Sequence, residues 1–144
     1  MKKVIWVTLL SISIAVLVSS CGKPIMSSAR WYTPEQVATG KPLYAQYCAG
    51  CHGESGQGGV NWETALPNGS YPPQPLNESG HAWHHSLAQL EETIADGGKH
   101  PGATMPGFSG VLNKDERLAV ISAFQSFWGD RTYSGWLGRG GLSK

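Results

Sequence analysis

Charged side chains are scarce in this sequence, and neither sign dominates. Its 144 residues include 11 Lys and Arg and 10 Asp and Glu, and the formal net charge is +1. If residues 1–20 are removed, Lys2 and Lys3 go with them, and nine cationic side chains remain against ten anionic ones. A nucleic-acid-binding surface needs many clustered cations, and charge-driven binding to lipid needs a polybasic segment. The composition therefore supports neither function.

The sequence also lacks an apolar run long enough for an ordinary membrane-spanning helix. Residues 4–18 are apolar apart from one Thr and two Ser, and they follow the basic start at Lys2 and Lys3. A run of this length after basic residues is typical of a secretory signal. We therefore expect the protein to be exported.

The end of this run resembles a bacterial lipobox, in which a Cys becomes the lipidated first residue of the mature protein. Val18, Ser19 and Ser20 precede Cys21 here. We expect residues 1–20 to be a lipoprotein signal peptide, Cys21 to carry the lipid and residues 21–32 to form a flexible stem. The expected location is the periplasmic or extracytoplasmic side of a membrane. An ordinary signal peptide cut near Ser20, or an uncleaved anchor, is the alternative.

Cysteine is nearly absent. Cys21 belongs to the lipobox, and the other two cysteines, Cys48 and Cys51, stand in one short motif. No pair is left for a disulfide, although exported proteins commonly form them. Lipidation of one cysteine and a shared role for the other two would account for all three.

The motif CAGCH at residues 48–52 is the pattern of covalent haem attachment. Two thiols three positions apart, at Cys48 and Cys51, each add to one haem vinyl group, and His52 then lies under the iron. A zinc half-site would want a second pair of ligands, and no further Cys exists. A thioredoxin-like redox pair would not need His52. We therefore predict one covalently bound haem c.

A sixth ligand to the iron is predicted at Met105. Met1 and Met26 belong to the signal and stem, so Met105 is the only Met in the predicted domain, in a loop before the last expected helix. A thioether favours ferrous iron and raises the reduction potential. The alternative for Met105 is to fill a gap in the core. Competing ligands are histidines, at positions His81, His84, His85 and His100.

Three helices are expected, each beginning with a capping box, and no strand pattern of useful length is present. The boxes pair Thr33 with Gln36, Ser86 with Gln89, and Asn113 with Glu116. The first helix runs towards residue 48, either as one kinked helix or as two short ones around Pro42; the others cover 86–95 and 113–128. Residues 53–80 and 99–110 read as loops. Residues 129–144 form a Gly-rich tail that we expect to be mobile, with docking through Trp136 and Leu137 as the alternative.

Residues 33–128 resemble class I cytochrome c. The motifs are Gly40-x-x-Leu43-Tyr44, Cys48-x-x-Cys51-His52-Gly53, Met105-Pro106-x-Phe108 and the final helix, residues 118–128. The resemblance implies an all-α fold, with three to four helices wrapped around one haem. The chain departs from the family in the Pro-rich segment 61–76 and in the tail after residue 128.

The resemblance also implies particular contacts. The first and last helices would cross at Gly40, and Tyr44 would stack near Phe124. A proline carbonyl would accept the second ring proton of His52; Pro75 is the best match, with Pro72 and Pro73 as alternatives. Trp83 and Tyr71 would either bond the haem propionates or only pack against the porphyrin.

The functional prediction is a single-electron carrier and not an enzyme, because no other catalytic constellation is present. It would be a monomer that serves a membrane oxidase or dehydrogenase. One alternative is a haem enzyme or a gas or redox sensor with a labile sixth ligand. Another is a metal-binding or copper-delivery lipoprotein built on three histidines, His81, His84 and His85.

Overall fold

The computed structural model describes residues 29–143 and contains helices without any strand in that range. The helices are α1 (Pro34–Tyr47), α2 (Ala49–His52), the 3-10 turn η1 (Ala82–His84), α3 (Leu87–Asp96), α4 (Lys114–Gln125) and α5 (Asp130–Gly138). The prediction of an all-α, cytochrome c-like fold is confirmed. The predicted signal peptide and the lipidation of Cys21 lie outside the described residues.

All three predicted capping boxes are present. The side chains of Thr33, Ser86 and Asn113 accept hydrogen bonds at the starts of α1, α3 and α4, and the matching Gln or Glu bonds back to each cap. Such reciprocal bonds satisfy backbone N–H groups that a helix start otherwise leaves free. The short local sequences therefore fix where these helices begin.

The first helix is continuous through Pro42, which decides between the two alternatives for this segment. Proline cannot donate to the carbonyl four residues earlier. That carbonyl belongs to Ala38, and both Ala38 and Pro42 are exposed, so water can satisfy the freed group.

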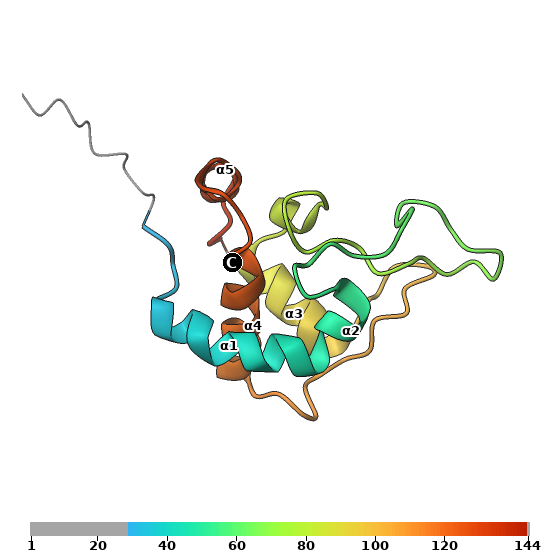
Figure 1. Cartoon of the computed structure of the whole chain (residues 1–144), viewed down its shortest axis with the longest axis horizontal. Helices are drawn as coiled ribbons and strands as arrows, with labels where there is room; N and C mark the ends of the chain where they lie inside the picture. Colours follow the sequence, from blue (N-terminus) through green and yellow to red (C-terminus); the bar gives the residue numbers. More distant parts are fainter. Residues whose placement is uncertain (1–28, 144) are drawn as a thin grey trace, which may run out of the picture.

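α1 and α4 cross at Gly40, as predicted (Figure 1). A Cβ atom placed on Gly40 would lie 1.8 Å from the carbonyl oxygen of Ala119, so no larger residue fits without separating the helices. The prediction for Tyr44 needs correction. Its ring pairs edge-on with Phe127 at 5.6 Å rather than with Phe124. The reason is that α4 ends at Gln125 and the chain turns there, which brings Phe127 towards α1.

The segment after α4 is not the mobile tail that we expected. It docks on the domain through Trp136, as the alternative prediction stated. It forms α5, whose residues Tyr133 and Trp136 are fully buried. The Trp136 indole N–H donates to the carbonyl of His85 at 2.7 Å, which ties α5 to the segment before α3. Burial of large aromatic side chains therefore holds this helix to the domain.

The start of the described chain packs against the same region. The guanidinium of Arg30 bonds the carbonyl of Trp128 at 3.1 Å and the Asp130 carboxylate at 2.8 Å. The Trp31 indole N–H donates to the side-chain oxygen of Gln125 at 2.6 Å. The packed part of the chain thus begins within the segment predicted as stem. Among residues 29–143, no helix combines the length and the apolar character needed to cross a bilayer.

Candidate functional site

Cys48 lies between α1 and α2, and Cys51 and His52 lie in the single turn of α2 that follows it. α1 ends at Tyr47, and the carbonyl of Cys48 accepts from the backbone N–H of Cys51 at 3.1 Å and of His52 at 2.8 Å. Residues three apart on a helical turn share a face, so both thiols serve the same side. Cys48 is buried and Cys51 is exposed, and neither forms a disulfide.

The environment of Cys48 does not suit a redox-active pair. Burial, helped by the neighbouring Cys51 thiol, raises the pKa of Cys48 to about 11. A disulfide-exchange cysteine needs a lowered pKa, since the thiolate is the nucleophile. The described residues also contain no group of three or more His, Cys, Asp and Glu side chains arranged to hold a metal ion. Both observations weaken the redox-pair and zinc alternatives.

The His52 ring is oriented by a backbone carbonyl. Its Nδ1 lies 2.8 Å from the carbonyl oxygen of Gln74. A carbonyl can only accept, so Nδ1–H is the donor and the lone pair of Nε2 remains free to bind a metal. Burial lowers the pKa of His52, and the Gln74 bond opposes this only in part. The imidazole is therefore held neutral, which is the form that ligates iron.

The carbonyl that orients His52 is one residue earlier than predicted. Pro75 was the expected partner, but its carbonyl faces Gly80, where an added Cβ would lie 2.2 Å from the oxygen. The Pro73 carbonyl is also occupied, because it accepts from the N–H of Gly59 at 2.7 Å. Pairing of the Gly-rich segment 56–59 with residues 73–77 thus leaves Gln74 to face His52.

Met105 lies in the loop between α3 and α4 and is half-buried against the hydrophobic core. Its carbonyl accepts from the N–H of Gly98 at 3.0 Å, and the N–H of Phe108 donates to the carbonyl of Ile94 at 2.9 Å. The loop is therefore fastened to the end of α3 at Met105 and at Phe108. Its role as the sixth ligand stays a prediction.

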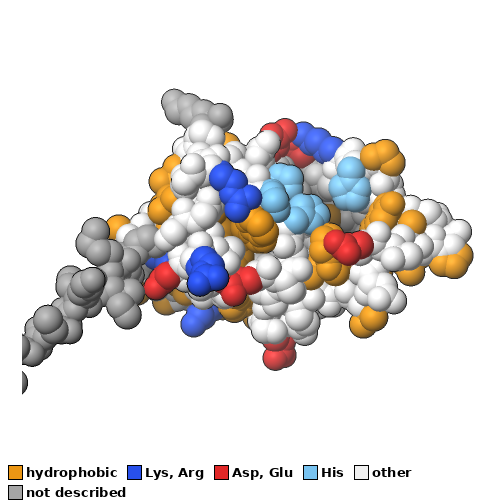
Figure 2. Space-filling view, turned by 90° about the horizontal axis from the view of Figure 1, so that it is seen from above, with side chains coloured by type: hydrophobic (Ala, Val, Ile, Leu, Met, Phe, Trp, Pro, Cys, Tyr) orange, Lys and Arg blue, Asp and Glu red, His pale blue; other side chains and the backbone are white. Residues whose placement is uncertain are grey.

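Three of the four predicted rival histidines, His81, His84 and His85, lie in or beside η1, and His100 lies in the loop after α3. Histidine side chains gather on one face of the molecule (Figure 2). The ring of His81 lies 5.6 Å from that of His85 and 6.5 Å from that of His84, and it stacks on Trp62 at 5.2 Å. Burial, and then the nearby histidines, lower the pKa of His81. The structure thus brings these rings together without forming a three-ligand metal group among the described residues.

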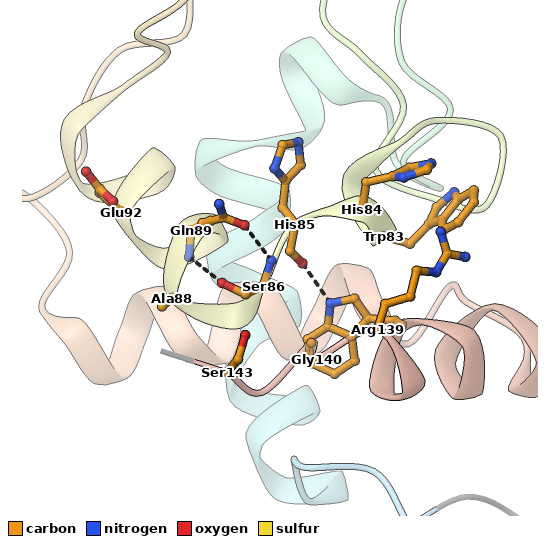
Figure 3. A pocket seen from close by; sticks show the side chains of 12 residues that line it. Trp83, His84, His85, Ser86, Ala88, Gln89, Glu92, Arg139, Gly140 and Ser143 are labelled. Carbon is orange, nitrogen blue, oxygen red and sulfur yellow. Dashed lines mark hydrogen bonds between the residues drawn. The ribbon is translucent and has the colours of Figure 1, made fainter.

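A cavity of about 400 Å³ lies beside this cluster, between η1, α3 and α5 (Figure 3). The Arg139 guanidinium lies over the ring of Trp83, 4.4 Å from its centroid, and the Trp83 indole N–H donates to the carbonyl of Gly80 at 2.8 Å. A bond to a haem propionate was one of the two roles proposed for Trp83, with packing against the porphyrin as the other, and here its N–H is bonded within the protein. Neither His52 nor Met105 lines this cavity.

The donor set at residues 48–52 fits a covalently held haem. Two free thiols on one turn offer the two thioether bonds, and a neutral imidazole with a free Nε2 follows the second of them. Apolar side chains half-buried against the core would supply contacts for a porphyrin; they include Tyr47, Leu76, Leu87, Met105 and Phe108.

Comparison with known proteins agrees with this chemistry. The family model "Cytochrome C oxidase, cbb3-type, subunit III" matches residues 35–122. The chain is also 31% identical, over 106 residues, to the Cbb3-type cytochrome c oxidase subunit FixP of Bradyrhizobium diazoefficiens. This alignment covers 69% of the chain and 33% of the relative, so the chain matches about a third of that protein. The helices, the attachment motif and the family match together establish that the chain belongs to the c-type cytochrome family of cbb3-type oxidase subunit III.

Proposed function

We propose that this protein is a single-haem electron carrier. Cys48 and Cys51 would hold the haem through thioether bonds, and His52 and Met105 would be its two axial ligands. The observation that carries the proposal is the turn at residues 48–52, where two free thiols precede an imidazole whose Nδ1–H is bound to Gln74. Few other cofactors would use this set of groups.

A bound haem supplies one-electron exchange, and the protein sets its potential and its access. Gln74 fixes the His52 ring and strengthens its donation to a metal. The thioether of Met105 would favour the reduced state and so raise the potential. If His52 and Met105 both held the iron, no position would remain for a substrate, and the protein would act as a carrier rather than as an enzyme.

The proposed partner is a membrane oxidase of the cbb3 type. The family match and the similarity to an oxidase subunit support this assignment. Lipidation of Cys21 would hold the domain at the extracytoplasmic surface of a membrane, which would raise its local concentration near a membrane complex. The protein would work as a monomer. A membrane dehydrogenase is the alternative partner.

The decisive experiment is expression in a host competent for cytochrome c maturation. We expect haem staining that survives denaturation, and an intact mass that includes one haem. The Cys48→Ser/Cys51→Ser variant should lose both. A colourless protein with the mass of the bare polypeptide would refute the proposal.

The sixth ligand is tested separately with Met105→Ala. This variant should lose the thioether-to-iron charge-transfer band and have a lower reduction potential. Met26→Ala is the matched control, since Met26 precedes the domain, and it should keep both properties. If Met105→Ala retained the band, or if the reduced wild type were five-coordinate, the ligand assignment would fall and the haem enzyme alternative would gain support.

Labelling with a fatty-acid precursor tests the anchor. Wild type should incorporate label and fractionate with membranes, and Cys21→Ser should do neither. Label in the Cys21→Ser variant would remove this part of the proposal.

A further inference from the structure

An apolar loop, residues 60–71, projects from one end of the domain (Figure 1). It carries three of the five large hydrophobic side chains that are exposed among residues 29–143: Val60 is 86% exposed, Leu66 46% and Tyr71 38%. Single exposed apolar residues are common on soluble proteins, but several on one projecting segment are typical of an interaction site. Figure 2 shows hydrophobic side chains at this end of the molecule.

Hydrogen bonds and ring contacts hold the apolar loop in shape. The N–H of Leu66 donates to the carbonyl of Ser70 at 2.7 Å, and the N–H of Tyr71 donates to the carbonyl of Gly102 at 3.2 Å. Trp62 stacks on His81, with ring centroids 5.2 Å apart. Since the loop is already ordered, binding through it costs little conformational entropy. Its apolar side chains are thus presented in fixed positions.

Charge is almost absent from the apolar loop and from the residues that flank it in the sequence. Between Ser55 and Asn77 the only charged side chain is that of Glu63. A partner that bound through ion pairs would need complementary charges here, and one carboxylate offers very little. The chemistry of the loop therefore fits an uncharged, apolar partner surface.

The position of the apolar loop favours a protein partner over a bilayer. The described chain begins at the opposite end of the molecule, where Arg30 bonds Asp130 (Figure 1). The residues between Cys21 and that end could extend roughly 30 Å at most. A membrane that holds Cys21 would be tethered to that end of the domain, and the apolar loop lies at the other end (Figure 1).

The apolar loop is also continuous with the backbone that orients His52. Gly59 and Pro73, just outside its two ends, bond to each other at 2.7 Å, and Gln74 follows directly. A protein that bound the loop would thus sit next to the segment that touches the proposed iron ligand. Electron transfer benefits from such closeness between partner and redox centre.

We propose that the apolar loop is the docking surface for the oxidase partner, which meets it with an uncharged, apolar patch. This inference rests on the proposed function for the identity of the partner. The loop acts through Val60 and Leu66, and binding through it is insensitive to salt, because no ion pairs are involved.

The test uses haem-loaded protein and the purified cbb3-type oxidase of the same organism, with affinity measured by surface plasmon resonance. Val60→Ser/Leu66→Ser should bind at least about tenfold more weakly than wild type. The matched control is Val111→Ser/Leu142→Ser, which removes the two large exposed hydrophobic side chains that residues 29–143 carry outside the loop, and it should bind like wild type. Both variants should keep the wild-type absorption spectrum and reduction potential, and Leu66→Glu should repeat the loss.

Several results would overturn the proposal. Equal binding by wild type and the loop variant would do so, as would an equal loss in the control variant. Loop-dependent binding to phosphatidylcholine vesicles, or loop-dependent self-association in light scattering, would assign the surface to lipid or to a second copy instead. If wild type carried haem but did not bind the oxidase, the docking proposal would fail while the haem assignment stood. A colourless wild type would mark failure of the proposed function itself.

Discussion

The Nδ1 atom of His52 lies 2.8 Å from the carbonyl oxygen of Gln74, although the two residues are separated by a long loop. Backbone pairing between residues 56–59 and 73–77 creates this contact. The N–H of Leu76 donates to the carbonyl of Gly56 at 2.8 Å, so the Pro-rich segment is held against the Gly-rich one. The orientation of the proposed iron ligand therefore depends on how two irregular segments meet.

Gly80→Ala should disturb this orientation. A Cβ at position 80 would lie 2.2 Å from the Pro75 carbonyl oxygen, and the backbone next to Gln74 would have to shift. Overpacking of this kind costs about 1–3 kcal/mol. We expect that loss in urea unfolding of the haem-loaded protein. Gly110→Ala is the control, since nothing lies within 4 Å of its added Cβ. Equal stability of the two variants would show that the peptide between Pro75 and Leu76 is not tightly held.

Gly40→Ala should be more severe. Here the added Cβ would lie 1.8 Å from a backbone oxygen, that of Ala119, which cannot rotate away as a side chain would. α1 and α4 would have to separate, so we expect a loss of about 3 kcal/mol or more, or a failure to accumulate. Gly138→Ala is the matched helical control, because its added Cβ meets nothing within 4 Å. A Gly40→Ala protein within about 1 kcal/mol of wild type would contradict the close crossing.

The parts of the fold that could be predicted from the sequence are those that depend on residues close together along the chain. Each capping box joins residues three apart, and the attachment motif occupies five consecutive positions. α5 has no such signal. Its N-cap residue, Gly129, has no side chain that could cap the helix, and the helix contains Gly135. Its stability comes from burying Tyr133 and Trp136 against distant residues, which a local pattern does not reveal.

The candidate site likewise has one part that could be predicted from the sequence and one part that could not. Cys48, Cys51 and His52 could be found from their spacing alone, but the carbonyl facing His52 could not. Four residues in the run 72–75 offer similar carbonyls, and pairing with segment 56–59 selects Gln74 over Pro75. An extended Pro-rich segment gives no local preference for one carbonyl over the next. The pairing of Tyr44 with Phe127 was missed for a related reason, since it depends on where α4 ends.

Acid should weaken the packing of His81. Burial, followed by His85 and His84, lowers the pKa of His81 from its ordinary value of 6.5, and Glu63 opposes this only in part. Because the folded protein disfavours the charged ring, this contribution to stability is complete above about pH 6.5 and is lost as the pH falls towards the lower folded pKa.

The variant His81→Phe keeps a ring against Trp62 and removes the titrating group. The measurement is urea unfolding of the haem-loaded proteins at about pH 7.5 and about pH 5. We expect wild type to lose more stability than His81→Phe between these conditions. If both proteins lost the same amount, His81 would not be a source of acid sensitivity, and a direct NMR titration of its ring would be expected to show an ordinary pKa.

Trp136 should prove to be the main attachment of α5. Its side chain is 1% exposed, and its indole N–H donates to the His85 carbonyl at 2.7 Å. Trp136→Ala should cost about 3–5 kcal/mol, whereas Trp136→Phe should cost only about 1–3 kcal/mol, because it keeps a ring but leaves that carbonyl without a donor. Arg139→Gln is the control: it removes an exposed cation–π contact with Trp83, worth about 0.5–1 kcal/mol. Hydrogen exchange of the α5 amides should quicken in the order Arg139→Gln, Trp136→Phe, Trp136→Ala. A mobile tail would instead show fast exchange in wild type and almost no effect of any of the three.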